Sequence, residues 1–120
     1  MAETTSEALA GVNADLTQRV VVDTGPMTWE PSPSGTVWRK PLYRQGGEFG
    51  PATSLVRYAA GGAFPEHAHP KGEEFLVLEG EFCNEHGRYP EGTWIRSPHM
   101  SQHTPFSEAG CLIYVRVGAL

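Results

Sequence analysis

The sequence lacks the features of a membrane-spanning or nucleic-acid-binding protein. No apolar run approaches the ~20 residues that cross a bilayer, so we expect no membrane partner. Nine lysines and arginines are scattered among 14 acidic residues, giving a formal charge of −5. Phosphate binding needs clustered positive charge, so we expect no nucleic-acid partner. The first five residues have neither the basic nor the apolar stretch of a secretory signal, which predicts a cytoplasmic protein.

Cysteine is also scarce. Cys83 and Cys111 are the two cysteines of the chain, and their spacing forms no CxxC pair. Two thiols in a cytosolic protein are usually small buried apolar side chains, and this is our expectation for both. A redox pair is the alternative, although nothing in the spacing requires it.

Glycine and proline are abundant, with 14 and 10 residues, and they divide the chain into short segments. This punctuation favours short strands joined by turns over long helices. We therefore predict an all-β sandwich or barrel of eight to ten strands. Residues 1–18 are predicted to be a flexible N-terminal tail, and residues 19–120 one domain. The predicted strands cover residues 19–22, 27–30, 36–40, 42–44, 53–58, 73–79, 92–96 and 111–117, with a hairpin at 84–87.

The predicted strand at residues 73–79 is apolar on both alternating faces after Glu74. A strand exposed on one side should instead alternate between apolar and polar side chains. We therefore expect both faces to be covered, one by the opposite sheet and the other by another strand or a second subunit. A homodimer would follow from the second case.

Three histidines and one glutamate have the spacing of a metal site. His67 and His69 are two residues apart, so in a strand they point to the same face. Pro70–Gly72 can turn the chain and return Glu73 to their side, and His103 adds an imidazole from a distant strand. Three imidazoles and one carboxylate suit Zn or Fe, and also Mn, Ni or Cu. On spacing alone, a solvated surface histidine pair remains equally consistent with the sequence.

The residues around these four resemble the cupin family. Gly61, His67, His69, Glu73 and Gly80 match the first cupin motif at every fixed position. Gly92, Pro98 and His103 resemble the second motif. The resemblance implies an all-β double-stranded β-helix, the cupin jelly-roll barrel, with these His and Glu side chains pointing inward.

Longer runs are similar to the ChrR-type cupins, a group that includes the C-terminal domain of the ChrR anti-sigma factors, which sense oxidative stress. These runs are residues 38–42, 53–58, 72–80 and 89–94. The resemblance implies that His67, His69, Glu73 and His103 bind metal, often zinc. The 18 residues ahead of the predicted domain contain no cysteine, so we expect a stand-alone cupin without the zinc-binding anti-sigma domain.

The sequence departs from the second motif at two positions and offers competing side chains at others. Met100 stands where glycine is usual, and Ser107 stands at the position of the final asparagine. His99 could compete with His103 as a ligand. Glu74 could compete with Glu73, although Glu73 has the motif spacing to Gly80.

Three side chains other than the four predicted metal ligands are further candidates for the site. His86 lies in a predicted hairpin turn, which favours a solvated side chain over a ligand. Arg57 and Arg96 lie on predicted strands. Either could meet an anionic substrate, although a surface or ion-paired arginine is the commoner case.

Three functions are compatible with such a centre. A mononuclear metal site with open positions could catalyse the dioxygenation of a small molecule such as a β-diketone, an enediol or a thiol. A sensor or ligand-binding module for oxidative stress is the second function, and a closed structural zinc site without catalysis is the third. Function depends on the site rather than on the fold, so the fold alone does not choose among them.

The ligand assignment predicts the effect of single histidine substitutions. His67→Ala or His103→Ala should lose most of the bound metal and lower the melting temperature, because each removes a metal–ligand bond that forms only in the folded chain. His86→Ala, the control, should change neither. Elemental analysis and thermal denaturation of the three variants test this, and full metal retention in His67→Ala would overturn the assignment.

Overall fold

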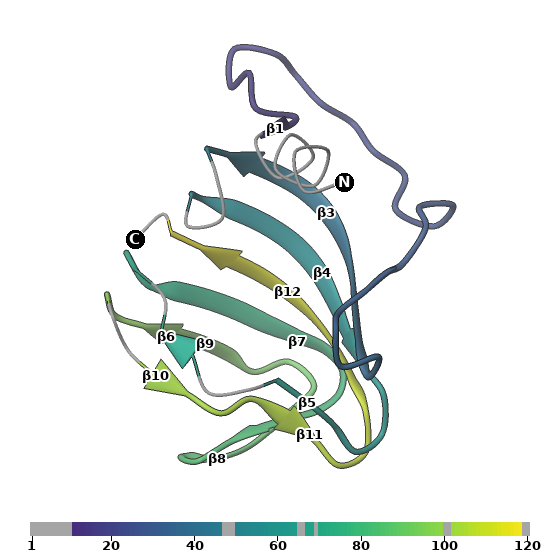
Figure 1. Ribbon diagram of the computed structural model, residues 1–120, viewed down its shortest axis with the longest axis vertical. Helices are drawn as coiled ribbons and strands as arrows, with labels where there is room; N and C mark the ends of the chain where they lie inside the picture. Colours follow the sequence, from purple (N-terminus) through teal and green to yellow (C-terminus); the bar gives the residue numbers. More distant parts are fainter. Residues whose placement is uncertain (1–10, 47–49, 65–66, 69, 100–101, 119–120) are drawn as a thin grey trace.

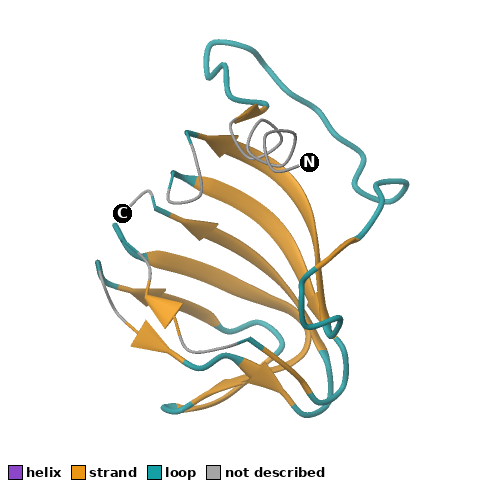
Figure 2. Ribbon diagram, in the orientation of Figure 1, coloured by secondary structure: helices purple, strands orange, loops and turns teal. Residues whose placement is uncertain are grey.

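The computed structural model describes residues 11–46, 50–64, 67–68, 70–99 and 102–118. These residues form strands, turns and loops, and no helix occurs among them (Figure 2). No helix in this part of the chain is long and apolar enough to cross a membrane. The strands are β1 (Gly11–Val12), β2 (Glu30–Pro31), β3 (Val37–Gln45), β4 (Ala52–Tyr58), β5 (Gly62–Ala63), β6 (His67–Ala68), β7 (Glu73–Asn84), β8 (Gly87–Pro90), β9 (Trp94–Ser97), β10 (Gln102–His103), β11 (Phe106–Ser107) and β12 (Cys111–Val117).

One antiparallel sheet curls round to enclose the core. Its order is β1-β3-β4-β12-β7-β11-β5, with β2 added to β3 and with β8 and β9 added to β7. A separate two-stranded sheet, β10-β6, is drawn over β9 and below β7 in the view of Figure 1. This arrangement confirms the predicted all-β barrel.

Alternation along the central strands separates an inner face from an outer face. On β4, Ala52, Ser54, Val56 and Tyr58 are buried, while the residues between them are less so. Strand pairing sets Tyr58, Val56, Ser54 and Ala52 opposite alternate residues of β12, from Cys111 to Val117. Directly opposed residues share a face of the sheet, so these side chains form rows across the inside of the barrel.

Aromatic rings close the lower part of the core. The Tyr58 ring meets the rings of Phe64 and Phe82 edge to face, with centroids 5.9 and 5.8 Å apart. Phe75 packs against Phe82 with a centroid distance of 4.5 Å. Such contacts add stability beyond the apolar area that they bury.

Strand β3 differs from its prediction in one respect that matters for the site. The sequence predicted two strands divided by Pro41, whereas β3 is continuous from Val37 to Gln45 with a register shift between Pro41 and Tyr43. Proline has no N–H to donate to a ladder, and a bulge accommodates it. Because the bulge adds one residue, Arg44 lies opposite the inward-facing Ala52.

The strands predicted at residues 19–22 and 27–30 are corrected by the structure. Residues 19–22 form no strand, and the second prediction reduces to β2 at Glu30–Pro31. Both β1 and β2 pair with β3, so the segment that joins them, residues 13–29, runs along the outside of that strand. The Lys40 ammonium group holds this segment, donating to the Thr24 carbonyl oxygen at 2.7 Å and lying 4.5 Å from the centre of the Trp29 ring.

The N-terminal tail predicted over residues 1–18 stays a prediction. Residues 1–10 lie outside the described part of the chain, and Gly11–Val12 pair with Gln45 and Arg44 of β3. The sheet therefore includes two residues ahead of the predicted domain boundary.

Strand β7 is longer than predicted, because it continues through Gly80 to Asn84. Gly80 has a φ of 75°, a conformation that other residues rarely adopt. A Cβ atom there would lie only 2.1 Å from the Gly110 carbonyl oxygen. Glycine therefore lets β7 bend past the loop before β12.

Candidate metal centre

Backbone pairing brings two of the four predicted ligands together. Strands β6 and β10 are antiparallel, and His103 lies directly opposite His67. Opposed residues in an antiparallel pair have Cα atoms roughly 4.5–5.5 Å apart. Two histidines distant in sequence thus occupy one row of one small sheet. His69 lies outside the described residues.

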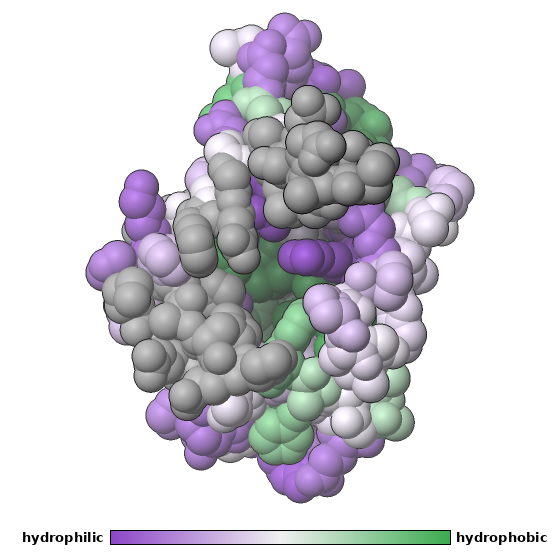
Figure 3. Space-filling view, viewed as in Figure 1, coloured by the Kyte–Doolittle hydropathy of each residue, from purple (hydrophilic) through white to green (hydrophobic). Residues whose placement is uncertain are grey.

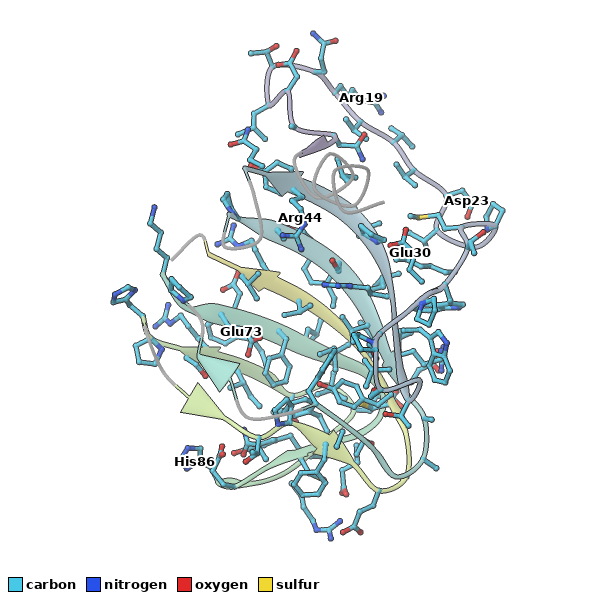
Figure 4. The ribbon with its side chains drawn as sticks, in the orientation of Figure 1. Arg19, Asp23, Glu30, Arg44, Glu73 and His86 are labelled. Atoms are coloured by element: carbon cyan, nitrogen blue, oxygen red, sulfur yellow. The ribbon has the colours of Figure 1, made fainter. Side chains whose placement is uncertain are left out.

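Glu73 begins β7 on the inner face of the barrel. It pairs with Val117 of β12 and Ser97 of β9, and it is 9% exposed. Figure 4 shows its side chain on the concave side of the sheet. Glu74 belongs to the opposite face, where its Oε1 lies 3.2 Å from the Arg116 Nε. Of the two adjacent carboxylates, Glu73 is therefore the one that can act inside the barrel.

A turn positions Glu73 at the start of its strand. Lys71 and Gly72 both have positive φ angles, 62° and 78°. The Lys71 backbone N–H donates to the His99 Nδ1 at 2.6 Å, which ties this turn to the loop after β9. His99, considered above as a competing ligand, thus has one ring nitrogen committed to the backbone.

A cavity of about 410 Å³ occupies the inside of the barrel beside Glu73. Figure 3 shows a hollow on this face with hydrophobic side chains at its floor. This volume suits a small molecule, because ligand sites usually measure about 300–1,000 Å³. Its apolar lining includes Val37, Val56, Phe64, Phe75, Phe82 and Ile113.

Arg44 is a cavity residue that the sequence analysis missed. It lines the cavity with Glu73 and is 8% exposed. Strand pairing places Arg44, Ala52, Val117 and Glu73 in one row across β3, β4, β12 and β7. Strict alternation from Val37 would have pointed Tyr43 inward instead. Pro41 marks an interruption in the sequence, but only the strand pairing shows that the interruption is a bulge that reverses the alternation.

The two arginines considered as anion contacts lie on the outer side of the sheet. An Arg57 Nη2 lies 3.8 Å from the Glu79 Oε1, and its guanidinium stands 5.4 Å from the centre of the Trp29 ring. Arg96 stands 5.5 Å from the centre of the Trp94 ring. Neither lines the cavity, so an anionic ligand there would meet Arg44.

His86 and the two cysteines have local surroundings that match their expected minor roles. His86 lies in the β7–β8 turn with its side chain 74% exposed. Cys83 and Cys111 are free and buried. Burial raises the pKa of both thiols, which favours the protonated form. The expectation of buried small side chains is confirmed.

Tyr58 supplies a neutral hydroxyl to the cavity wall. Burial is the main cause that raises its pKa well above the usual value, and nearby Cys111 and Glu73 add to this effect. Its hydroxyl therefore stays protonated and uncharged at neutral pH.

Of the four predicted ligands, Glu73 is the one whose side chain the structure describes. Among the described residues, no group of three or more His, Cys, Asp or Glu side chains could hold a metal. What supports a metal here is a buried carboxylate in a cavity wall and the paired backbone of His67 and His103. Both features fit a metal held by histidine and glutamate.

Comparisons with known proteins identify the fold and the family. A family model described as the ChrR cupin-like domain matches residues 17–120. A search of curated proteins finds no match. A chain in the crystal structure of Rhodobacter sphaeroides SigE in complex with the anti-sigma ChrR is 28% identical, with a TM-score of 0.66. The match covers 79% of the present chain and 51% of that one, so the present chain spans about half its length.

More distant structures share the fold. An acetylacetone dioxygenase from Acinetobacter johnsonii is 16% identical, with a TM-score of 0.73 over 88% of the present chain and 78% of its own. An RmlC-like cupin protein from Ralstonia eutropha is 18% identical, with a TM-score of 0.72 over 85% and 69%. The barrel is therefore a cupin, and the predicted resemblance to ChrR-type cupins is confirmed.

Proposed function

The chain belongs to the ChrR cupin-like domain family, and on this premise we propose that it holds one divalent transition metal through His67, His69, Glu73 and His103. The register that sets His103 opposite His67 supports the assignment, as does the buried Glu73 in the cavity wall. A divalent cation beside this carboxylate would offset the cost of burying its charge. Zn or Fe suits this donor set, as do Mn, Ni and Cu.

The function proposed for this centre is dioxygenation of a small molecule bound in the cavity. The observation that carries the proposal is the cavity itself, because a purely structural metal site needs no adjoining space for a ligand. When bound, Fe(II) would supply Lewis acidity and redox capacity. The chain's own part is binding and exclusion of water: Val56, Phe75 and Ile113 give the ligand an apolar wall.

Two other functions have some support. The 28% identity with a chain of the SigE–ChrR complex favours a sensor or ligand-binding module whose metal site is read by a protein partner. A structural zinc site without catalysis is the third function, since four protein ligands can close a tetrahedral shell.

Metal analysis followed by oxygen uptake separates these functions. The protein would be purified without a tag or chelator, analysed for metal, loaded anaerobically with Fe(II), and mixed with diketones, thiols and phenolics. We expect oxygen consumption that depends on both the protein and one class of substrate. The zinc-loaded protein is the matched control and should consume none, because Zn²⁺ has no redox chemistry. Stoichiometric zinc with no uptake by the iron form would contradict the dioxygenase and favour the sensor or structural function.

We also propose that the outer face of the sheet pairs two copies of this chain. Leu55, Tyr114, Leu76 and Trp94 form one row across this face. Tyr114 is 42% exposed and Trp94 55%, and the nearby Leu78 is 36% exposed. The outer face of the apolar segment of β7 is thus not covered by other residues of the same chain.

The charges beside this apolar row favour a second copy as the occupant. The Arg116–Glu74 pair lies on one side of the row and the Arg57–Glu79 pair on the other. A two-fold axis joins identical patches, so a patch that carries both signs of charge can complement itself.

Sedimentation analysis tests the homodimer. The wild-type protein should be a dimer at micromolar concentration, and Trp94→Glu should be a monomer because it buries a charge in the interface. Val21→Glu is the control, since Val21 is 74% exposed on the N-terminal segment and outside the row. A monomeric wild type, or a Trp94→Glu variant that remains dimeric, would contradict the proposal.

A further inference from the structure

We infer that the cavity binds a small organic carboxylate and that Arg44 is the residue that binds its charge. The inference rests on the proposed function, because it names the chemical class of the ligand for the same site.

The bulge in β3 gives Arg44 its position. Val37, Arg39 and Pro41 lie opposite the inward-facing Tyr58, Val56 and Ser54, and the extra residue then brings Arg44 opposite Ala52. Bulges occur preferentially next to functional sites, where they redirect a side chain. Without this one, a tyrosine would occupy the inward position and the arginine would face outward.

Arg44 and Glu73 stand at the two ends of one row. Three strand spacings of roughly 4.8 Å separate them, which is about 14 Å measured along the sheet. The sheet curls, so the path through the cavity is shorter than the path along the wall. Figure 4 labels both residues on the inner side of the sheet. A small molecule can therefore lie between them, with one end at each.

The buried charges of the cavity favour an anion. Arg44 is always charged, and its planar guanidinium matches the geometry of a carboxylate. With a divalent metal bound, one glutamate and three neutral imidazoles leave the proposed centre with a net positive charge, so the metal end of the cavity would also attract an anion. The other charged lining residues, Glu30 and Arg39, are of opposite sign and exposed.

The wall between the two ends sets the remaining chemistry of the ligand. Val56, Phe75, Ile113 and Val115 line it and present no hydrogen-bonding side-chain group. Low-dielectric walls strengthen an interaction between a carboxylate and a guanidinium compared with the same contact in water. This apolar part of the wall favours a carboxylate on a short apolar or keto-substituted body, and the Ser54 and Tyr58 hydroxyls that also line the cavity are groups that can hydrogen-bond a keto oxygen.

Matched ligand pairs test the inference by titration calorimetry. Acetoacetate and acetylacetone have the same number of heavy atoms and differ in that one carries a carboxylate where the other carries a methyl ketone. Phenylpropionate and phenylpropionamide form a second pair with a larger apolar body. The wild-type protein with its bound metal should bind each carboxylate at least about tenfold more tightly than its neutral partner, because charge-assisted hydrogen bonds are the stronger class.

Two variants assign this preference to Arg44. Arg44→Gln should bring the affinity ratio of each pair close to one while leaving the affinity for acetylacetone little changed. Arg57→Gln removes an arginine from the outer side of the sheet and should keep the wild-type ratio. Arg44→Lys keeps the charge without the planar fork and should retain part of the preference, so the test survives if the glutamine variant fails to fold.

The outcomes separate this inference from the metal proposal. Equal affinities within both pairs, failure of either carboxylate to bind, or an undiminished preference in folded Arg44→Gln would overturn the inference, even if the protein contains stoichiometric metal. An Arg44-dependent preference that persists in a protein found to bind no metal would support the inference and overturn the metal centre.

Discussion

The register of four central strands, β3, β4, β12 and β7, decides which side chains meet inside the barrel. Antiparallel pairing fixes each row to the residue, and a slip by one position would exchange the inner face for the outer one. Val56, Ile113 and Val77 thus form one inner row, and Arg44, Ala52, Val117 and Glu73 form another. The apolar core, the cavity and the placement of Arg44 and Glu73, the two buried charges that line the cavity, all follow from the same set of backbone hydrogen bonds.

The same register gives the outer face a separate role. Glu74 and Arg116 are one residue away from Glu73 and Val117, yet they form an ion pair outside the barrel. The apolar row from Leu55 to Trp94 lies on that side too, half covered. One set of strands can thus carry ligand chemistry on its concave side and subunit association on its convex side, because alternation keeps the two sets of side chains apart.

The sequence predicted the fold wherever alternation was strong and uninterrupted. The strand at residues 111–117 has the predicted bounds, and β4 begins one residue earlier than predicted. The three valines at positions 20–22 misled the prediction of a strand at residues 19–22, because local β-propensity does not show that β1 and β2 already pair with β3. Arg44 could not be predicted, since its direction depends on a bulge that only the pairing of β3 with β4 reveals. For the site, the motif spacing indicated His67, His69, Glu73 and His103. The structure adds the pairing of His67 with His103 and the direction of Glu73, while His69 lies outside the described residues.

The choice between two adjacent carboxylates gives the most direct test of the metal centre. Glu73→Gln and Glu74→Gln make the same chemical change one residue apart, the first inside the barrel and the second outside it. Metal content should be measured by elemental analysis of both variants and the wild type, purified identically. The proposed centre predicts that Glu73→Gln loses most of the metal while Glu74→Gln keeps the wild-type amount. Equal metal content in the two variants, or a greater loss in Glu74→Gln, would contradict it.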